Sequence, residues 1–119
     1  MSLCIAVGAK TMVIATTVFT LQWTHSVEKI DWREQWQIEP AGLHLVEARV
    51  KGSGAGMEPG DDAKLKDGWW TWTPKLAPIK QLSLAASGTT GGGWHLCYAD
   101  TCIELGKQAG QSAVLSPCP

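Results

Sequence analysis

The chain has 119 residues, of which 45% are hydrophobic and 18% charged, and its formal net charge is -1. This length fits a single domain that can bury a core of its own. The near-neutral charge argues against a protein that binds a nucleic-acid backbone, which needs a basic face. Seven tryptophans stand against one Phe and one Tyr, and the polar N–H of indole predicts that several are half-buried or lie at a binding surface.

Residues 1–24 carry one charge, Lys10, and resemble a weak signal peptide. The segment lacks a further basic residue and a small-residue cleavage site, and it is rich in Thr and Val, which favour strands. It is also too short and too polar to span a bilayer. We therefore expect folded strands, no transmembrane segment and, by default, a cytoplasmic location, with a periplasmic or exported location as the alternative.

Alternating patterns predict strands along most of the chain. Residues 3–7 and 11–16 form a hairpin with Gly8 in the turn. From 18 to 25 and from 31 to 39 apolar and polar side chains alternate. His25 is the last inward residue of the first of these strands, and Glu34 is a carboxylate on a Trp-bearing face. A short connection places His25 and Glu34 near the same end of a hairpin.

The next strand, 43–50, changes its apolar side partway, which predicts a β-bulge or a strand that crosses between sheet surfaces. Arg49 in this strand is the natural counter-ion for Glu34 or Glu47. A long glycine-rich loop follows over 51–68, and long loops in compact domains are usually functional or mobile.

Further strands are predicted over 68–73 and 81–86, and a closing hairpin pairs 94–98 with 101–105. Eight or nine short strands without an amphipathic helix predict an all-β fold, a single-domain antiparallel β-sandwich or small barrel. We expect this domain to span residues 1–105, with 106–119 as a C-terminal tail packed loosely on it.

Cys97 and Cys102 fit either a hairpin disulfide or two reduced core thiols. A zinc site with His95 is a third alternative, but structural zinc needs four ligands and usually a tighter cysteine pair. We therefore expect no metal site, and no motif in the sequence calls for a cofactor.

Two predicted loops contain groups that could take part in catalysis or in ligand binding. His25 and Ser26 with Glu28 or Glu34 contain the residue types of a hydrolase triad, but adjacent strand residues point to opposite faces and no nucleophile elbow is present. The glycines of 52–56 could present backbone N–H groups to an anion or could serve a tight turn.

The order of the motifs resembles a known family. Trp-Thr-His-Ser-Val-Glu-Lys at 23–29, Trp-Arg-Glu at 32–34, Leu-Val-Glu-Ala-Arg-Val-Lys-Gly-Ser-Gly-Ala-Gly-Met-Glu-Pro at 45–59 and Gly-Trp-Trp at 68–70 are similar to the domain of unknown function 1850 (DUF1850). The likeness covers roughly residues 3 to 105. Members are small bacterial proteins encoded beside TRAP transporters of the TAXI kind, and some carry a membrane anchor that is not evident here.

The resemblance implies an accessory role near solute uptake, with a TRAP transporter component or a small solute as partner. We expect a non-enzymatic binding domain, with an acid–base pair of His25 and Glu34 as the enzymatic alternative and a buried Glu34–Arg49 pair as the purely structural one. The candidate binding residues are His25, Ser26, Glu28, Glu34, Glu47, Arg49, Gly54, Gly56, Met57, Glu58, Trp69 and Trp70.

Overall fold

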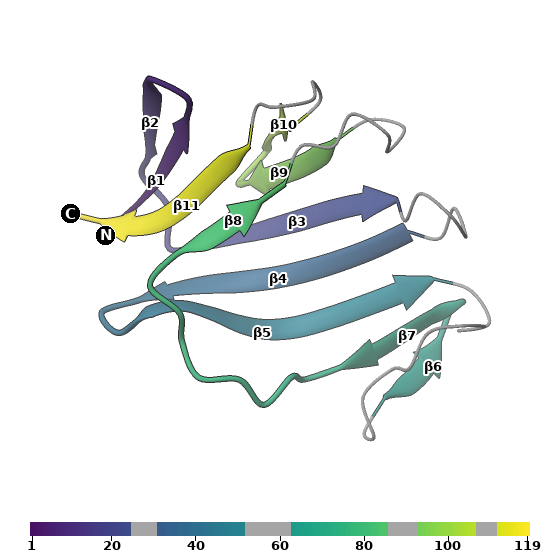
Figure 1. Cartoon of the computed structure of the whole chain (residues 1–119). Helices are drawn as coiled ribbons and strands as arrows, with labels where there is room; N and C mark the ends of the chain where they lie inside the picture. The colour runs from purple at the N-terminus through teal and green to yellow at the C-terminus, as the bar shows by residue number, and fades with distance from the viewer. Residues whose placement is uncertain (25–30, 52–62, 86–92, 107–111) are drawn as a thin grey trace.

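The chain folds into two antiparallel sheets that pack face to face (Figure 1). The computed structural model describes residues 1–24, 31–51, 63–85, 93–106 and 112–119. Eleven strands lie within these ranges, where the sequence predicted eight or nine. The described strands form a sandwich and do not close into a barrel, which confirms the all-β antiparallel class. Within the same ranges, no helix is long and apolar enough to cross a membrane.

The smaller sheet has the strand order β2-β1-β11-β8. Its strands are β1 (Ser2–Val7), β2 (Lys10–Ile14), β8 (Leu82–Leu84) and β11 (Ala113–Cys118). β11 lies between β1 and β8, and its Ala113 and Leu115 are fully buried. The expectation of a loose tail after Leu105 is therefore wrong for 113–118. These residues form an interior strand. The sequence did not predict it, because the apolar alternation is short and the segment contains Pro117.

The larger sheet has the strand order β10-β9-β3-β4-β5-β7-β6. Its central strands are β3 (Val18–Thr24), β4 (Asp31–Glu39) and β5 (Gly42–Lys51). One edge is the hairpin of β9 (Trp94–Tyr98) and β10 (Thr101–Leu105). The other edge is formed by β7 (Trp69–Trp72) and β6 (Lys64–Lys66), which extend beyond the smaller sheet (Figure 1).

Apolar side chains from both sheets fill the space between them. Period-two alternation places alternate residues of the central strands in this layer. The larger sheet contributes more, because its central strands are longer. The buried core consists of Leu3, Ile5, Ile14, Phe19, Leu21, Trp36, Ile38, Leu43, Leu45, Leu84, Leu96, Leu105, Ala113 and Leu115.

A β-bulge interrupts the pairing of β4 with β5. Gln35 is opposite Glu47 and Trp36 is opposite Leu45, so Val46 has no partner residue on β4. The extra residue reverses which side of β5 faces the core. The change of apolar side in the sequence predicted this feature, and the structure confirms it.

Gly42 begins β5 where the backbone of Ile79 approaches closely. The N–H of Leu43 donates to the carbonyl of Ile79 at 2.6 Å, and the N–H of Ile79 donates back at 2.9 Å. Gly42 has a φ of 138°, and a Cβ there would collide with the Ile79 carbonyl. Only glycine fits this crossing, which fastens the segment between β7 and β8 to the sheet.

Two disulfides close the chain at different scales. Cys4–Cys118 joins β1 to β11 near the two termini, across 114 residues of sequence. Cys97–Cys102 joins directly opposed residues of the β9–β10 hairpin. Of the three alternatives for Cys97 and Cys102, the structure contains the disulfide. The alternative of a zinc site with His95 is wrong, because the two cysteine sulfurs are bonded to each other.

The two disulfides should differ in their effect on stability. In the chain-entropy model, a cross-link over 114 residues stabilises by about 5 kcal/mol and one over 5 residues by about 2 kcal/mol. We expect the double variant C4A/C118A to lose clearly more unfolding free energy than C97A/C102A. Urea unfolding of both variants beside the oxidised parent measures this. Equal losses would mean that local packing, and not loop closure, sets the contribution of each bridge.

Candidate functional site

Seven of the twelve candidate residues lie outside the residues that the structure describes. They are His25, Ser26, Glu28, Gly54, Gly56, Met57 and Glu58. The strands that lead to them end at the same end of the larger sheet. Thr24 of β3 pairs with Asp31 of β4, and β5 runs one residue past the Trp32–Val50 pair to Lys51.

The five described candidates divide between the two faces of the larger sheet. Glu34 and Trp70 lie on the inner face, which also carries the core. Glu47, Arg49 and Trp69 lie on the outer face. The structure therefore brings together two small groups of candidates and not one.

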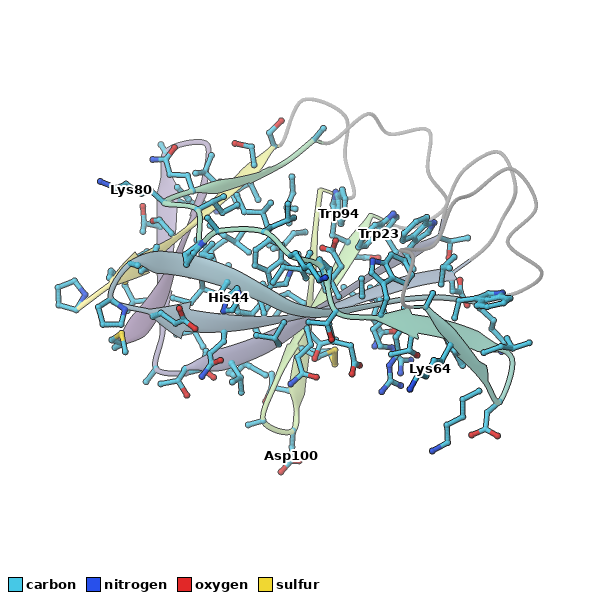
Figure 2. The ribbon with its side chains drawn as sticks, turned by 90° about the horizontal axis from the view of Figure 1, so that it is seen from below. Trp23, His44, Lys64, Lys80, Trp94 and Asp100 are labelled. Atoms are coloured by element: carbon cyan, nitrogen blue, oxygen red, sulfur yellow. A yellow bond between two sulfur atoms is a disulfide. The ribbon has the colours of Figure 1, made fainter. Side chains whose placement is uncertain are left out.

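The inner face bears a cluster of tryptophans at this end of the sheet. The ring of Trp23 stacks on Trp32 with centroids 5.9 Å apart and meets Trp94 at 4.7 Å. Trp32 meets Trp72 edge to face at 6.2 Å. Figure 2 shows Trp23 and Trp94 on one side of the sheet and Lys64 on the other. Such pairs add about 0.5–1.5 kcal/mol each to the area they bury, so these rings serve packing first.

Glu34 lies on the inner face beside this cluster, between Leu21 of β3 and Ala48 of β5. The Nε1 of Trp36 donates to Glu34 Oε1 at 3.1 Å. Burial raises the pKa of the Glu34 carboxyl, and the Trp36 hydrogen bond opposes that rise in part. Desolvation dominates because one neutral donor replaces only part of the lost hydration.

The pairing of Glu34 with Arg49, weighed from the sequence, is not present. Arg49 follows Ala48, the residue opposite Glu34, so its side chain leaves the other face of the sheet. Its Nε instead donates to Glu47 Oε1 at 2.6 Å. The alternative counter-ion predicted from the sequence, Glu47, is the one found. The proposed partner of Glu34 in acid–base chemistry, His25, lies outside the described residues.

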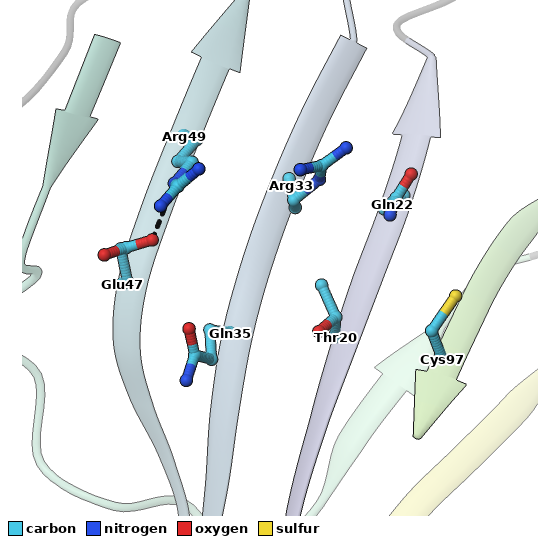
Figure 3. Close-up of a pocket in the computed structure, with 7 residues that line it drawn as sticks. All are labelled: Thr20, Gln22, Arg33, Gln35, Glu47, Arg49 and Cys97. Atoms are coloured by element: carbon cyan, nitrogen blue, oxygen red, sulfur yellow. Dashed lines mark hydrogen bonds and ion pairs between the residues drawn. The ribbon is translucent and has the colours of Figure 1, made fainter. Parts of the chain in front are cut away.

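The outer face places two arginines directly opposite each other. Arg33 of β4 pairs in register with Arg49 of β5 (Figure 3). Like charges opposed across strands are destabilising unless something compensates them. The carboxylate of Glu47 offsets the charge of Arg49 by forming an ion pair with it. The Nε of Arg33 is buried and has no hydrogen-bond partner among the described residues.

Trp69 of β7 supports the cations of this face. The Arg33 guanidinium lies 4.9 Å from the ring centroid and the Lys51 ammonium 5.7 Å from it. Each contact is attractive because the ring face is negative. Lys64 and Lys66 of β6 continue the same face, since Thr71 pairs with Lys64 and Trp69 with Lys66. We call Arg33, Arg49, Lys51, Lys64 and Lys66 the cationic face.

Hollows adjoin these side chains. The first, of about 250 Å³, is lined by Thr20, Gln22, Arg33, Gln35, Glu47, Arg49 and Cys97 (Figure 3). The second, of about 380 Å³, is lined by Arg49, Lys64, Lys66, Asp67, Trp69 and Thr71. Both are lined by cationic side chains, so an anion is the chemical group that fits them. No group of three potential metal ligands occurs in the described part of the chain.

Arg33, Gln22 and Gln35 are residues of this site that sequence reasoning missed. All three alternate outward from β3 and β4, which is the pattern of an ordinary solvated face. The available signal was the bulge: once β5 is shifted by one residue, the strand register places Arg33 opposite Arg49. Lys64 and Lys66 were missed because β6 lies within the expected long loop.

Glu34 should make stability depend on pH. Because its pKa is higher in the folded protein, its favourable contribution is complete below the pKa of the unfolded chain and is lost as pH rises through the folded pKa. We expect E34Q, which keeps an acceptor for Trp36, to be more stable than the parent at pH 7 and to differ little below about pH 4. Thermal unfolding across pH measures the difference. A parent that gains stability relative to E34Q with rising pH would contradict the desolvated carboxylate.

Comparison with known proteins identifies a family for most of the chain. No curated protein and no solved structure matches the chain. The family model described as "Domain of unknown function (DUF1850)" matches residues 19–105. That range holds all seven strands of the larger sheet apart from the first residue of β3. The match spans well over half of the chain, and the chain therefore belongs to the DUF1850 family.

Proposed function

We propose that this protein is a non-enzymatic accessory domain that binds a carboxylate-bearing solute on its cationic face and works with a TRAP-type solute transporter. The transporter context comes from the family resemblance. The carboxylate comes from one observation: Arg33 and Arg49 stand directly opposite each other beside a polar hollow. The two parts are separable, because the ligand can be tested on the purified chain.

A bound carboxylate would resolve the electrostatic conflict between the arginines. Among the described residues, Glu47 bonds to the Nε of Arg49, and the terminal N–H groups of that guanidinium are left for a ligand. Arg33 is held by Trp69 and contributes a second planar donor group. Guanidinium groups recognise carboxylates through paired, charge-assisted hydrogen bonds. Gln22 and Gln35 add neutral amides that can bond to the rest of the ligand.

The residues of the first hollow favour binding over catalysis. Glu47, the one carboxylate among its described lining residues, is bonded to Arg49 and so is a poor general base. The remaining lining groups are two arginines, two amides, a hydroxyl and a disulfide sulfur, none of which is paired with an activating base. Holding an anion needs no further group.

The two disulfides support an oxidising compartment for this function. Structural disulfides persist in the periplasm and outside the cell and are rare in the cytoplasm. We therefore favour the periplasmic or exported location over the cytoplasmic default, in keeping with a role in solute uptake.

Substitution of the arginines should weaken carboxylate binding. Hydrogen bonds to charged groups are worth about 1.5–3 kcal/mol, so R49Q should lower affinity by about 10- to 100-fold. R33Q should act similarly, and R49K should rescue little because an ammonium cannot bind a carboxylate bidentately. Isothermal titration with straight-chain mono- and di-acids and amino acids measures this.

The matched control is K80Q, which removes one positive charge from an exposed residue well away from the cationic face (Figure 2). We expect it to bind each acid as the parent does. If no acid in the panel binds the parent, or if K80Q weakens binding as much as R49Q, the carboxylate site is wrong.

The transporter partnership has its own test. Tagged parent protein should recover a TRAP transporter component from membranes of its own host, and a fold-destabilised control with reduced disulfides should not. Recovery of no transporter component under conditions that keep the parent folded would remove the transporter from the proposal and leave the ligand site unaffected.

A further inference from the structure

The guanidinium of Arg49 borders both hollows of the outer face. On one side it shares the first hollow with Arg33 and the two glutamines. On the other it shares the second hollow with Lys64, Lys66 and Trp69. A ligand that occupied both hollows would therefore cross Arg49.

The charges of the second hollow are not balanced by its own acids. Lys64 and Lys66 are exposed side chains of an edge strand, and Asp67 is the one carboxylate among the described residues that line this hollow. The cations of the two hollows belong to rows that cross the sheet: Arg33, Arg49 and Lys64 lie in one row, with Thr71 between the last two. The field along such a row favours anionic groups at both of its ends.

The register fixes how far apart two such anionic groups would be. β5 and β6 are separated by β7, so Arg49 and Lys64 lie two strand spacings apart. At about 4.8 Å per spacing the backbone separation is about 10 Å. Trp69 lines the second hollow and its ring contacts Arg33 of the first, so the indole adjoins both hollows and adds apolar surface beside the path of a carbon chain.

From this arrangement we infer that the ligand of the cationic face is an elongated di-acid. One carboxylate would bind Arg33 and Arg49 in the first hollow, and the second would bind Lys64 and Lys66 in the second hollow, with the chain crossing beside Trp69. The inference rests on the proposed function, since it names the class of carboxylate that the same face takes. It adds the prediction that a ligand with a single carboxylate occupies only one of the two hollows.

The experiment compares three acids on the purified parent by isothermal titration. Suberate carries a carboxylate at each end of a long chain, octanoate has the same chain length with one carboxylate, and succinate has two carboxylates on a short chain. We expect suberate to bind at least tenfold more tightly than either of the others, because only suberate reaches both hollows. Titration at two salt concentrations should show the steeper salt dependence for suberate.

Variants assign the two ends of the ligand. K64Q/K66Q should lower the affinity for suberate about tenfold and leave that for octanoate unchanged, while R33Q should weaken both. Circular dichroism should show no loss of fold for K64Q/K66Q, since both lysines are exposed.

The outcomes separate this inference from the proposed function. Equal binding of suberate and octanoate, or of suberate and succinate, would overturn the di-acid and leave the carboxylate site in place. Binding of none of the three acids would overturn both. The comparison of acids needs no variant, so it holds even if a substitution disturbs the sheet.

Discussion

The bulge at Val46 is the constraint on which both faces of the larger sheet depend. Strand side chains alternate, so an uninterrupted β5 would carry Leu43, Leu45, Glu47 and Arg49 on one face. One extra residue reverses the second half of the strand. Ala48 and Val50 then enter the buried layer, where they are 3% and 0% exposed. Glu47 and Arg49 are placed on the outer face, where their charges are solvated.

The two faces of the sheet consequently differ: the inner one carries packed apolar side chains and the outer one carries charged side chains. The inner face is packed against the smaller sheet, and stacked indoles extend its apolar layer toward the end where β3 meets β4. The outer face does not pack against a second sheet in the described part of the chain, and it holds opposed cations. The arrangement there would cost stability if it were bare, and the Glu47 carboxylate and Trp69 ring supply the compensation that the described residues offer.

The sequence was most informative where strands are long and half-buried. Alternation located β3, β4 and β5, and the reversal within β5 located the bulge. It was least informative for β6, whose Lys-Leu-Lys offers three residues in a region of glycines and aspartates, and for β11, whose burial depends on β1 from the other end of the chain. The pairing of Arg33 with Arg49 depends on register across the bulge, which neither strand specifies alone. Alternation placed Glu34 on the Trp-bearing face, but its hydrogen-bond donor, Trp36, comes from its own strand.

The family match divides unevenly between the two sheets. Residues 19–105 contain the larger sheet, whereas β1, β2 and β11 of the smaller sheet lie outside the match. The smaller sheet covers the apolar layer and is fastened by Cys4–Cys118 across nearly the whole chain. A cover of this kind needs only apolar side chains of the right volume on one face, and many sequences can supply them. The outer face of the larger sheet is different, because opposed arginines, a carboxylate and a supporting indole must occupy fixed positions in the register. The register thus constrains the outer face of the larger sheet more tightly than packing constrains its cover.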